Sequence, residues 1–245
     1  MVCKSCGSEV SSYITECPYC GNRLRKRAPK LDRDGRPAAR RPRLTPPPLL
    51  TRLRRDEIPG IRPETRPYAT LVLILGGLVG TLLWRTNLGA TGNDLEIFGK
   101  LGNHWWRLAT AVFTYDNTGY AIVTLASIGL FGWLLERRHG PTSVIGLFLI
   151  GGVGGLAATV AVYTVPFAMG ANGAAIAMVV AWALPDLLAL RSGEEVDGDL
   201  IGVAAILTVL ILMPLAAVGA SWVADGVGVA AGLLVGLPLA RMAVR

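Results

Sequence analysis

The sequence predicts an all-α polytopic membrane protein, in which a bundle of six transmembrane helices follows a small N-terminal cysteine module. The composition argues against an ordinary soluble protein, because 52% of the residues are hydrophobic, only 17% are charged and mean hydropathy is +0.47. The charge is also uneven, since residues 1–66 hold 16 of the 24 Lys and Arg. A sparsely charged apolar body behind a basic segment is typical of a membrane protein and not of a uniformly basic nucleic-acid binder.

All four cysteines lie within the first 20 residues, as the two Cys-x2-Cys pairs Cys3–Cys6 and Cys17–Cys20. Each pair offers two thiolates from one tight turn, and four thiolates complete the tetrahedral shell of a structural Zn²⁺. Residues 1–23 resemble the zinc-ribbon family, whose fold is a small β structure around one structural zinc. Because a segment this short has no core, metal binding should supply most of its folding free energy. A closed shell of four sulfurs leaves no coordination position for catalysis.

Two disulfides are the alternative to a metal site in this module. Disulfides require an oxidising compartment. The basic residues that follow the module predict that this end lies in the reducing cytoplasm. We therefore expect zinc, with a cytoplasmic protein as a candidate partner of the ribbon.

Residues 24–67 form a basic linker rich in proline and arginine. Prolines at this density block helices and favour extended backbone, and the segment has little apolar surface to bury. A basic segment next to a membrane more often fixes topology or meets anionic lipid than binds nucleic acid. The prolines are Pro29, Pro37, Pro42, Pro46, Pro47, Pro48, Pro59, Pro63 and Pro67.

Six apolar segments make up the predicted membrane domain, residues 68–242. A helix needs roughly 20 apolar residues to cross a bilayer, and each span should be helical because unpaired backbone groups are not tolerated in lipid. The predicted spans are 68–85, 119–135, 142–164, 169–190, 200–218 and 221–242.

The positions of the arginines predict the topology. With six spans, the N-terminal segment, Arg137 and Arg138 between the second and third spans, and the C-terminal Arg241 and Arg245 fall on one side. The positive-inside rule assigns that side to the cytoplasm. We expect a multi-pass protein of the plasma membrane with both termini inside, and an external first loop over about 86–118.

Four local motifs occur in order along the membrane domain. The first loop contains Trp106-Arg107, the second span ends in Leu-Glu136-Arg-Arg, the fourth begins Gly170-Ala-Asn-Gly173, and the sixth carries Gly228, Gly232 and Gly236. Taken together, these motifs and the six spans resemble the rhomboid superfamily of intramembrane proteins over about residues 68–242. The glycines at spacing four also suit close helix packing. Trp105 and Trp106 suit a membrane interface or a specific loop fold, and Arg107 suits either a bond within its loop or a lipid headgroup.

The resemblance also shows what this chain has replaced. Active rhomboids carry a serine in a Gly-x-Ser-Gly motif on the fourth span and a histidine on the sixth, which act as a dyad. Here Asn172 stands at the serine position and Asp225 at the histidine position, while Tyr120 and Thr124 replace the polar residues that assist the oxyanion. Acyl transfer needs an oxygen or sulfur nucleophile beside a base, which an amide does not supply.

The sequence therefore predicts a catalytically inactive pseudoprotease, and the resemblance implies that it binds transmembrane segments of client proteins in the lipid. The alternatives are an active rhomboid intramembrane serine protease, a scaffold acting through its ribbon, and a small-solute transporter. Asp225 is either hydrogen-bonded to Asn172 or solvated near the outer surface, since a carboxylate in a membrane has a partner or faces water.

Overall fold

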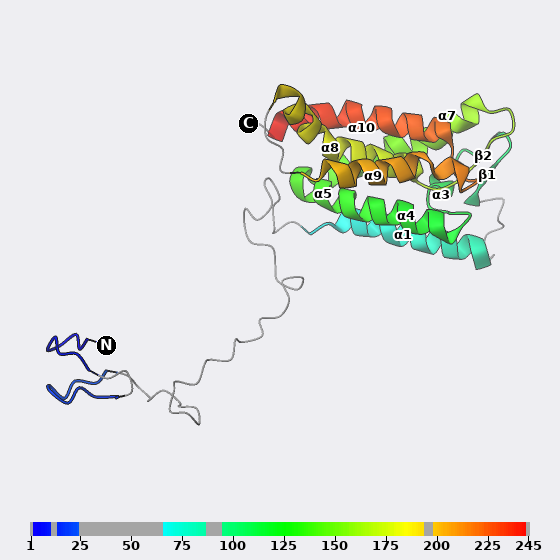
Figure 1. Cartoon of the computed structure of the whole chain (residues 1–245). Helices are drawn as coiled ribbons and strands as arrows, with labels where there is room; N and C mark the ends of the chain where they lie inside the picture. Colours follow the sequence, from blue (N-terminus) through cyan, green and yellow to red (C-terminus); the bar gives the residue numbers. More distant parts are fainter. Residues whose placement is uncertain (1, 11–13, 25–65, 87–94, 194–197, 244–245) are drawn as a thin grey trace. The chain divides into compact units, whose positions relative to one another are not determined.

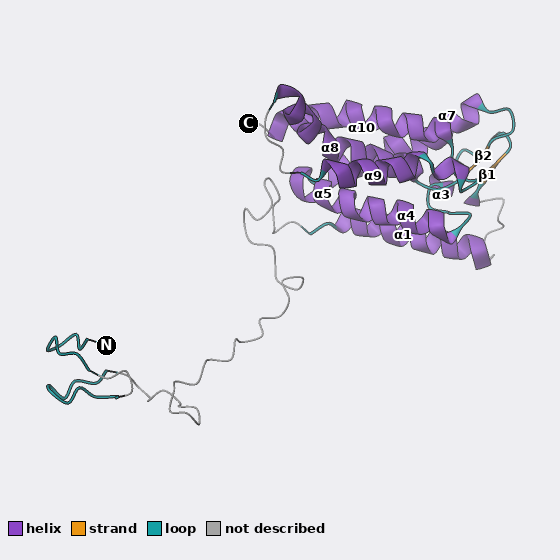
Figure 2. Cartoon of the chain, viewed as in Figure 1, coloured by secondary structure: helices purple, strands orange, loops and turns teal. Residues whose placement is uncertain are grey.

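In the computed structural model the chain forms two compact units, Met1–Thr51 and Arg52–Arg245. The structure describes residues 2–10, 14–24, 66–86, 95–193 and 198–243. The predicted linker over 24–67 therefore lies almost entirely outside the described residues. Figure 1 follows the chain from its N-terminus to its C-terminus, and Figure 2 shows that the described part of the second unit is almost entirely helical.

The described part of the first unit consists of two loops with the same backbone geometry. In each loop the amide of the first cysteine donates to a carbonyl five residues later, and a short β-bridge closes the base. Gly7 and Gly21 end the two turns at φ 69°, a conformation that glycine adopts without steric cost. The hydrogen-bonded pairs are Cys3 with Ser8 and Cys17 with Asn22, each at 2.9 Å, and the bridged pairs are Val2 with Glu9 and Glu16 with Arg23.

The second unit is a bundle of long helical rods. The first rod is α1 alone, and the next two each consist of three consecutive helical segments. The second rod joins α4, η2 and α5, and the third joins α6, η3 and α7, with a π-helical stretch in the middle of each. The principal elements are α1 (Tyr68–Thr86), α3 (Arg107–Ala111), α4 (Thr118–Ser127), η2 (Ile128–Gly132), α5 (Trp133–His139), α6 (Pro141–Leu147), η3 (Phe148–Val153), α7 (Gly154–Val162), α8 (Asn172–Ser192), α9 (Leu200–Ile211), η4 (Met213–Leu215) and α10 (Trp222–Ala243).

Among the described residues, five helices are long and apolar enough to cross a membrane, where the sequence predicted six. The fifth predicted span, 200–218, is the shorter apolar helix Leu200–Leu215, whose α-helical part α9 has 12 residues. Twelve residues span about 18 Å, against the roughly 30 Å of a hydrocarbon core. Pro214 lies in the short 3-10 helix η4 that follows α9, and its missing N–H removes one α-helical hydrogen bond at this point. The spanning helices are Tyr68–Thr86, Thr118–His139, Pro141–Val162, Asn172–Ser192 and Trp222–Ala240.

Helix α8 lies at the centre of the bundle and packs most closely against α10 (Figure 1). The predicted glycine face makes this contact. A Cβ at Gly228 would collide with the carbonyl of Gly173, and one at Gly232 would lie 2.7 Å from the Ala177 carbonyl. Gly226, which points away from this face, has no atom within 4 Å of such a Cβ. Small residues therefore set the approach of the two helices, as the spacing of four predicted.

Backbone hydrogen bonds from the first loop fix the point where α8 begins. The strand β1 (Ile97–Phe98) pairs antiparallel with β2 (Phe167–Ala168), just before α8. The amide of Gly170 donates to the carbonyl of Ala111, at the end of α3, at 2.7 Å. Loop and helix are thereby joined at one end of the bundle.

Glu136 on α5 holds the beginning of α1. It is almost completely buried, and its carboxylate accepts hydrogen bonds from the amides of Ala69 and Thr70 at 2.9 and 2.8 Å and from the Thr70 hydroxyl at 2.7 Å. The first amides of a helix have no partner within the helix, and the helix dipole favours a negative group there. The motif glutamate therefore joins the first and second rods.

Candidate functional site

The candidate site lies where α8 and α10 begin and α9 ends. Nδ2 of Asn172 donates to Oδ1 of Asp225 at 2.7 Å and to the carbonyl of Leu210 at 2.9 Å. Asn172 is 2% exposed and Asp225 is 4% exposed. The predicted hydrogen bond between the two side chains is therefore present, and the alternative of a solvated carboxylate is wrong.

One amide group thus uses both of its N–H donors to connect three helices. In an apolar interior a hydrogen bond to a charged or polar group is strong, and a donor or acceptor left without a partner is costly. Oδ1 of Asn172 and Oδ2 of Asp225 have no hydrogen-bond partner within the described part of the chain. The pair is therefore a buried contact between helices in which one oxygen of each side chain has no partner among the described residues.

Tyr120 covers the turn that leads into this pair. Its hydroxyl donates to the carbonyl of Met169 at 3.0 Å and occupies the space in which a Cβ at Gly170 would lie. Gly170 also has a φ of 86°, a conformation that favours glycine. A phenol ring, fully buried, therefore fills the space beside the start of α8 that the resemblance associates with the oxyanion.

Tyr115 is a site residue that the sequence reasoning missed. It is completely buried and packs edge to face on Tyr120, with ring centroids 5.0 Å apart. Burial raises the pKa of Tyr115, so that its hydroxyl stays neutral. Nothing in the sequence around Tyr115 distinguishes it from an ordinary loop tyrosine, because its role depends on a contact with another helix.

Among the described residues, Ser221 and the two histidines do not pair with Asp225. Ser221 forms a hydrogen bond of 3.0 Å with Thr159 and accepts from the amide of Val223. Within the described residues, no serine or histidine side chain forms a hydrogen bond with the Asp225 side chain. His104 lies in the first loop beside Trp106, with ring centroids 4.6 Å apart, and His139 ends α5.

The first-loop motif lies at the beginning of α3 and outside the Asn172–Asp225 contact. Trp105 is 72% exposed and Trp106 is 41% exposed, and Arg107 is half-buried. Exposed tryptophans at one end of a helical bundle suit a membrane interface. The motif therefore belongs to the loop that supports the start of α8, through the hydrogen bond between Ala111 and Gly170.

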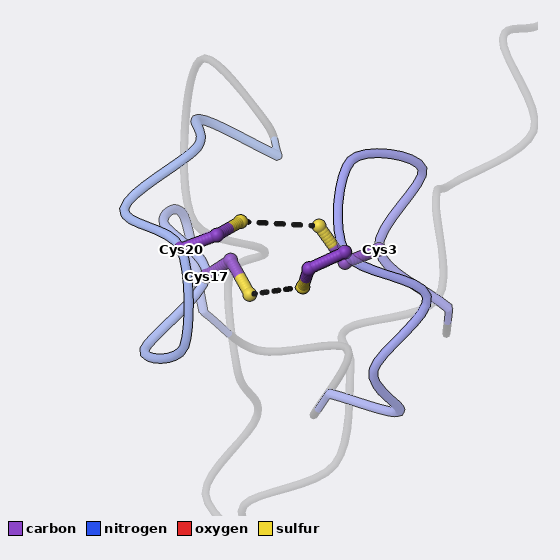
Figure 3. Close-up of side chains that lie close together, drawn as sticks. Cys3, Cys17 and Cys20 are labelled. Carbon is purple, nitrogen blue, oxygen red and sulfur yellow. Dashed lines mark hydrogen bonds between the residues drawn. The ribbon is translucent and has the colours of Figure 1, made fainter.

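The four cysteines of the first unit come together as predicted. Their sulfur atoms all lie within 4.8 Å of one another, with 3.7 Å between Cys3 and Cys20 and between Cys6 and Cys17. Figure 3 shows the sulfurs of the two loops facing one another. All four are free thiols, and the sulfur separations far exceed the roughly 2.05 Å of a disulfide. The arrangement could hold a metal ion.

The surroundings of Cys6 favour the thiolate that a metal needs. Hydrogen bonds with the Ser8 hydroxyl and backbone lower the pKa of Cys6 to about 6.

Cys3 and Cys17 are buried, whereas Cys6 and Cys20 are exposed. Each loop thus contributes one buried and one exposed sulfur.

The chain matches the family model of the rhomboid domain over residues 102–242. This match covers more than half of the 245 residues, and it includes the first-loop motif, Glu136, Asn172 and the glycine face of α10. The chain therefore belongs to the rhomboid family and is a multi-pass membrane protein. The comparison with curated proteins gave no match.

Removal of the Asn172 side chain should destabilise the bundle. Asn172→Ala leaves the Asp225 carboxyl and the Leu210 carbonyl without their donor, which should lower the free energy of unfolding by about 1–3 kcal/mol. Asn172→Ala/Asp225→Ala should lose less than the sum of the two single variants, with a coupling of about 0.5–3 kcal/mol.

Thermal unfolding of the purified protein in lipid nanodiscs measures both effects. Thr208→Ala, which removes a hydrogen bond within exposed α9, is the matched control and should change little. Strict additivity of the two site substitutions would contradict the observed contact.

Proposed function

We propose that this rhomboid-family protein is a catalytically inactive pseudoprotease that binds transmembrane segments of client proteins. The observation that carries the proposal is the hydrogen bond of 2.7 Å between Asn172 and Asp225. These residues stand where the family resemblance puts the nucleophile and the base. The amide nitrogen is not a nucleophile at neutral pH, and both of its protons are engaged in hydrogen bonds.

The fit of Tyr120 against Gly170 supports the same proposal. A proteolytic site needs room for a scissile carbonyl and donors placed where the oxyanion develops. In this chain the fully buried Tyr120 occupies the space beside Gly170, and its hydroxyl already donates to Met169. A peptide carbonyl would have to displace this phenol before it could reach the start of α8.

A client segment would enter between α4 and α9, the helices that the family resemblance associates with lateral entry. Helix α9 packs chiefly on α8 and makes only slight contact with α4 (Figure 1). It also presents apolar side chains outward, among them Ile201, 84% exposed, and Val209, 49% exposed. A short, weakly held helix with an apolar outer face can yield to another helix more easily than the tightly packed α8–α10 pair.

The metal that the first unit would hold is Zn²⁺ in a structural role. Zinc–sulfur bonds of about 2.3 Å place the sulfurs of a tetrahedron about 3.8 Å apart, close to the observed separations of 3.7 Å. Cys3, Cys6, Cys17 and Cys20 would hold it, and the ion would fix the two loops together. Four sulfur ligands leave no open position for a substrate.

The basic residues support a plasma-membrane location with both termini in the cytoplasm. In this orientation the zinc ribbon faces the cytoplasm, where it would recruit a protein partner. Thiolates persist in that reducing compartment, which agrees with the free cysteines. Lipid and transmembrane clients are then the partners of the second unit, and nucleic acid is not an expected partner.

A photo-crosslinking experiment tests the binding function. A photoreactive residue at Ile122 on α4 or Val209 on α9, both exposed apolar positions, should capture a transmembrane client in cells, and the captured client should have its full length. The same residue at Leu234 on α10, 72% exposed, is the matched control and should capture mainly lipid. Equal capture at all three positions, or capture of truncated clients, would contradict the proposal.

Metal analysis tests the proposed zinc ribbon. The purified chain should contain one zinc per molecule, because four cysteines complete one tetrahedral shell. Cys3→Ser should lose most of the metal, while Ser5→Ala, a neighbouring substitution of a residue with no sulfur, should keep it. A metal-free chain in which none of the four thiols can be titrated would instead show that the cysteines form two disulfides.

A further inference from the structure

Two arginines at the end of α5 have no carboxylate partner in the described part of the chain. Arg137 and Arg138 follow Glu136, and neither forms a hydrogen bond or an ion pair with any described residue. The two oxygens of Glu136 accept three hydrogen bonds from the beginning of α1 and none from either guanidinium group. Among the described residues, this end of the helix therefore presents two cations without a contacting anion.

Tryptophan rings hold both guanidinium groups in place. The Arg137 guanidinium lies 4.7 Å from the ring centroid of Trp133 on its own helix, and that of Arg138 lies 5.6 Å from Trp182 on α8. Such stacking fixes the plane of a guanidinium and leaves its outer edge free to bind. The Nε atoms of both side chains and Nη1 of Arg137 are buried without a partner in the described part of the chain. The other Nη groups are the donors that remain available.

The helix dipole favours basic residues in the last turn of α5, but it does not determine what their guanidinium groups bind. The Gly140 amide donates to the Glu136 carbonyl at 2.8 Å, and no described hydrogen bond joins either guanidinium group to a carbonyl of that turn. The two side chains therefore do not serve as caps of this helix.

The position of the two arginines indicates the ligand. They lie in the last turn of the candidate spanning helix Thr118–His139, and the end of a helix that crosses a bilayer is expected near the headgroups. Phosphate oxygens match the planar fork of a guanidinium, and anionic lipids attract basic residues next to a membrane. We propose that Arg137 and Arg138 form a binding site for the phosphate group of an anionic phospholipid, which would hold the ends of α5 and α8 together.

Native mass spectrometry of the purified full-length chain tests this site. The wild type should retain phosphatidylglycerol in preference to phosphatidylcholine of the same acyl chains. Arg137→Gln/Arg138→Gln should weaken the binding of phosphatidylglycerol roughly 25-fold, since each basic residue near an anionic surface contributes about five-fold. Arg191→Gln, an exposed arginine in the last turn of α8, is the matched control and should weaken binding by no more than about five-fold.

Two results would overturn the site. One is equal retention of the two lipids by the wild type, a comparison that needs no variant and so does not depend on whether the double variant folds. The other is equal retention of phosphatidylglycerol by the wild type and the folded double variant. Displacement of the lipid by excess inorganic phosphate, but not by chloride at the same ionic strength, would support recognition of the phosphate group, and equal displacement by both salts would reject it.

Discussion

The two hydrogen bonds of the Asn172 side chain connect three helices within an apolar bundle. One reaches Asp225 at the beginning of α10, and the other reaches the Leu210 carbonyl near the end of α9. The side chains of Asn172 and Asp225 are both almost completely buried, so the cost of separating these helices includes leaving buried polar groups unpaired. The close approach of α8 and α10 along Gly228 and Gly232 requires the same relative position of these two helices as the Asn172–Asp225 hydrogen bond, because Asp225 lies at the end of the glycine face.

This contact uses positions that the family resemblance assigns to catalysis. A serine and a histidine there would need freedom to exchange a proton and to meet a substrate. Asn172 and Asp225 instead form a static hydrogen bond, and Tyr120 fills the space next to Gly170. Under the proposed function the same scaffold would serve for binding in the membrane, and α9, which packs less extensively than the α8–α10 pair although Leu210 joins it to Asn172, would be the element that yields. Recognition would then come from helix packing and not from bond cleavage.

The sequence predicted those features that depend on residue type and spacing. Four cysteines in two close pairs predicted a metal module, and spacing of four among the glycines predicted the α10 face that meets α8. The Asn172–Asp225 contact followed from comparing two short motifs with the rhomboid pattern. Each of these predictions rests on one short stretch of sequence, or on two short stretches that the family pattern relates to each other.

Features that depend on distant contacts could not be predicted in this way. Glu136 was a motif residue without a role, because its partners are backbone amides of α1 that no side-chain pattern reveals. The Leu210 carbonyl and the ring of Tyr115 were missed for the same reason. The length of α9 was misjudged because apolar residues continue past Ile211, while the α-helix ends there and a 3-10 turn that contains Pro214 follows.

The central claim, that the rhomboid site of this protein is inactive, is tested most directly by proteolysis in reconstituted vesicles. The wild type is incubated with a transmembrane peptide and with a serine-reactive phosphonate probe, and Asn172→Ser/Asp225→His serves as the comparator. The account predicts no cleavage and no labelling by the wild type, and weak cleavage or labelling by the double variant. Cleavage and serine labelling by the wild type would contradict it, and would show that another hydroxyl of this chain acts as the nucleophile.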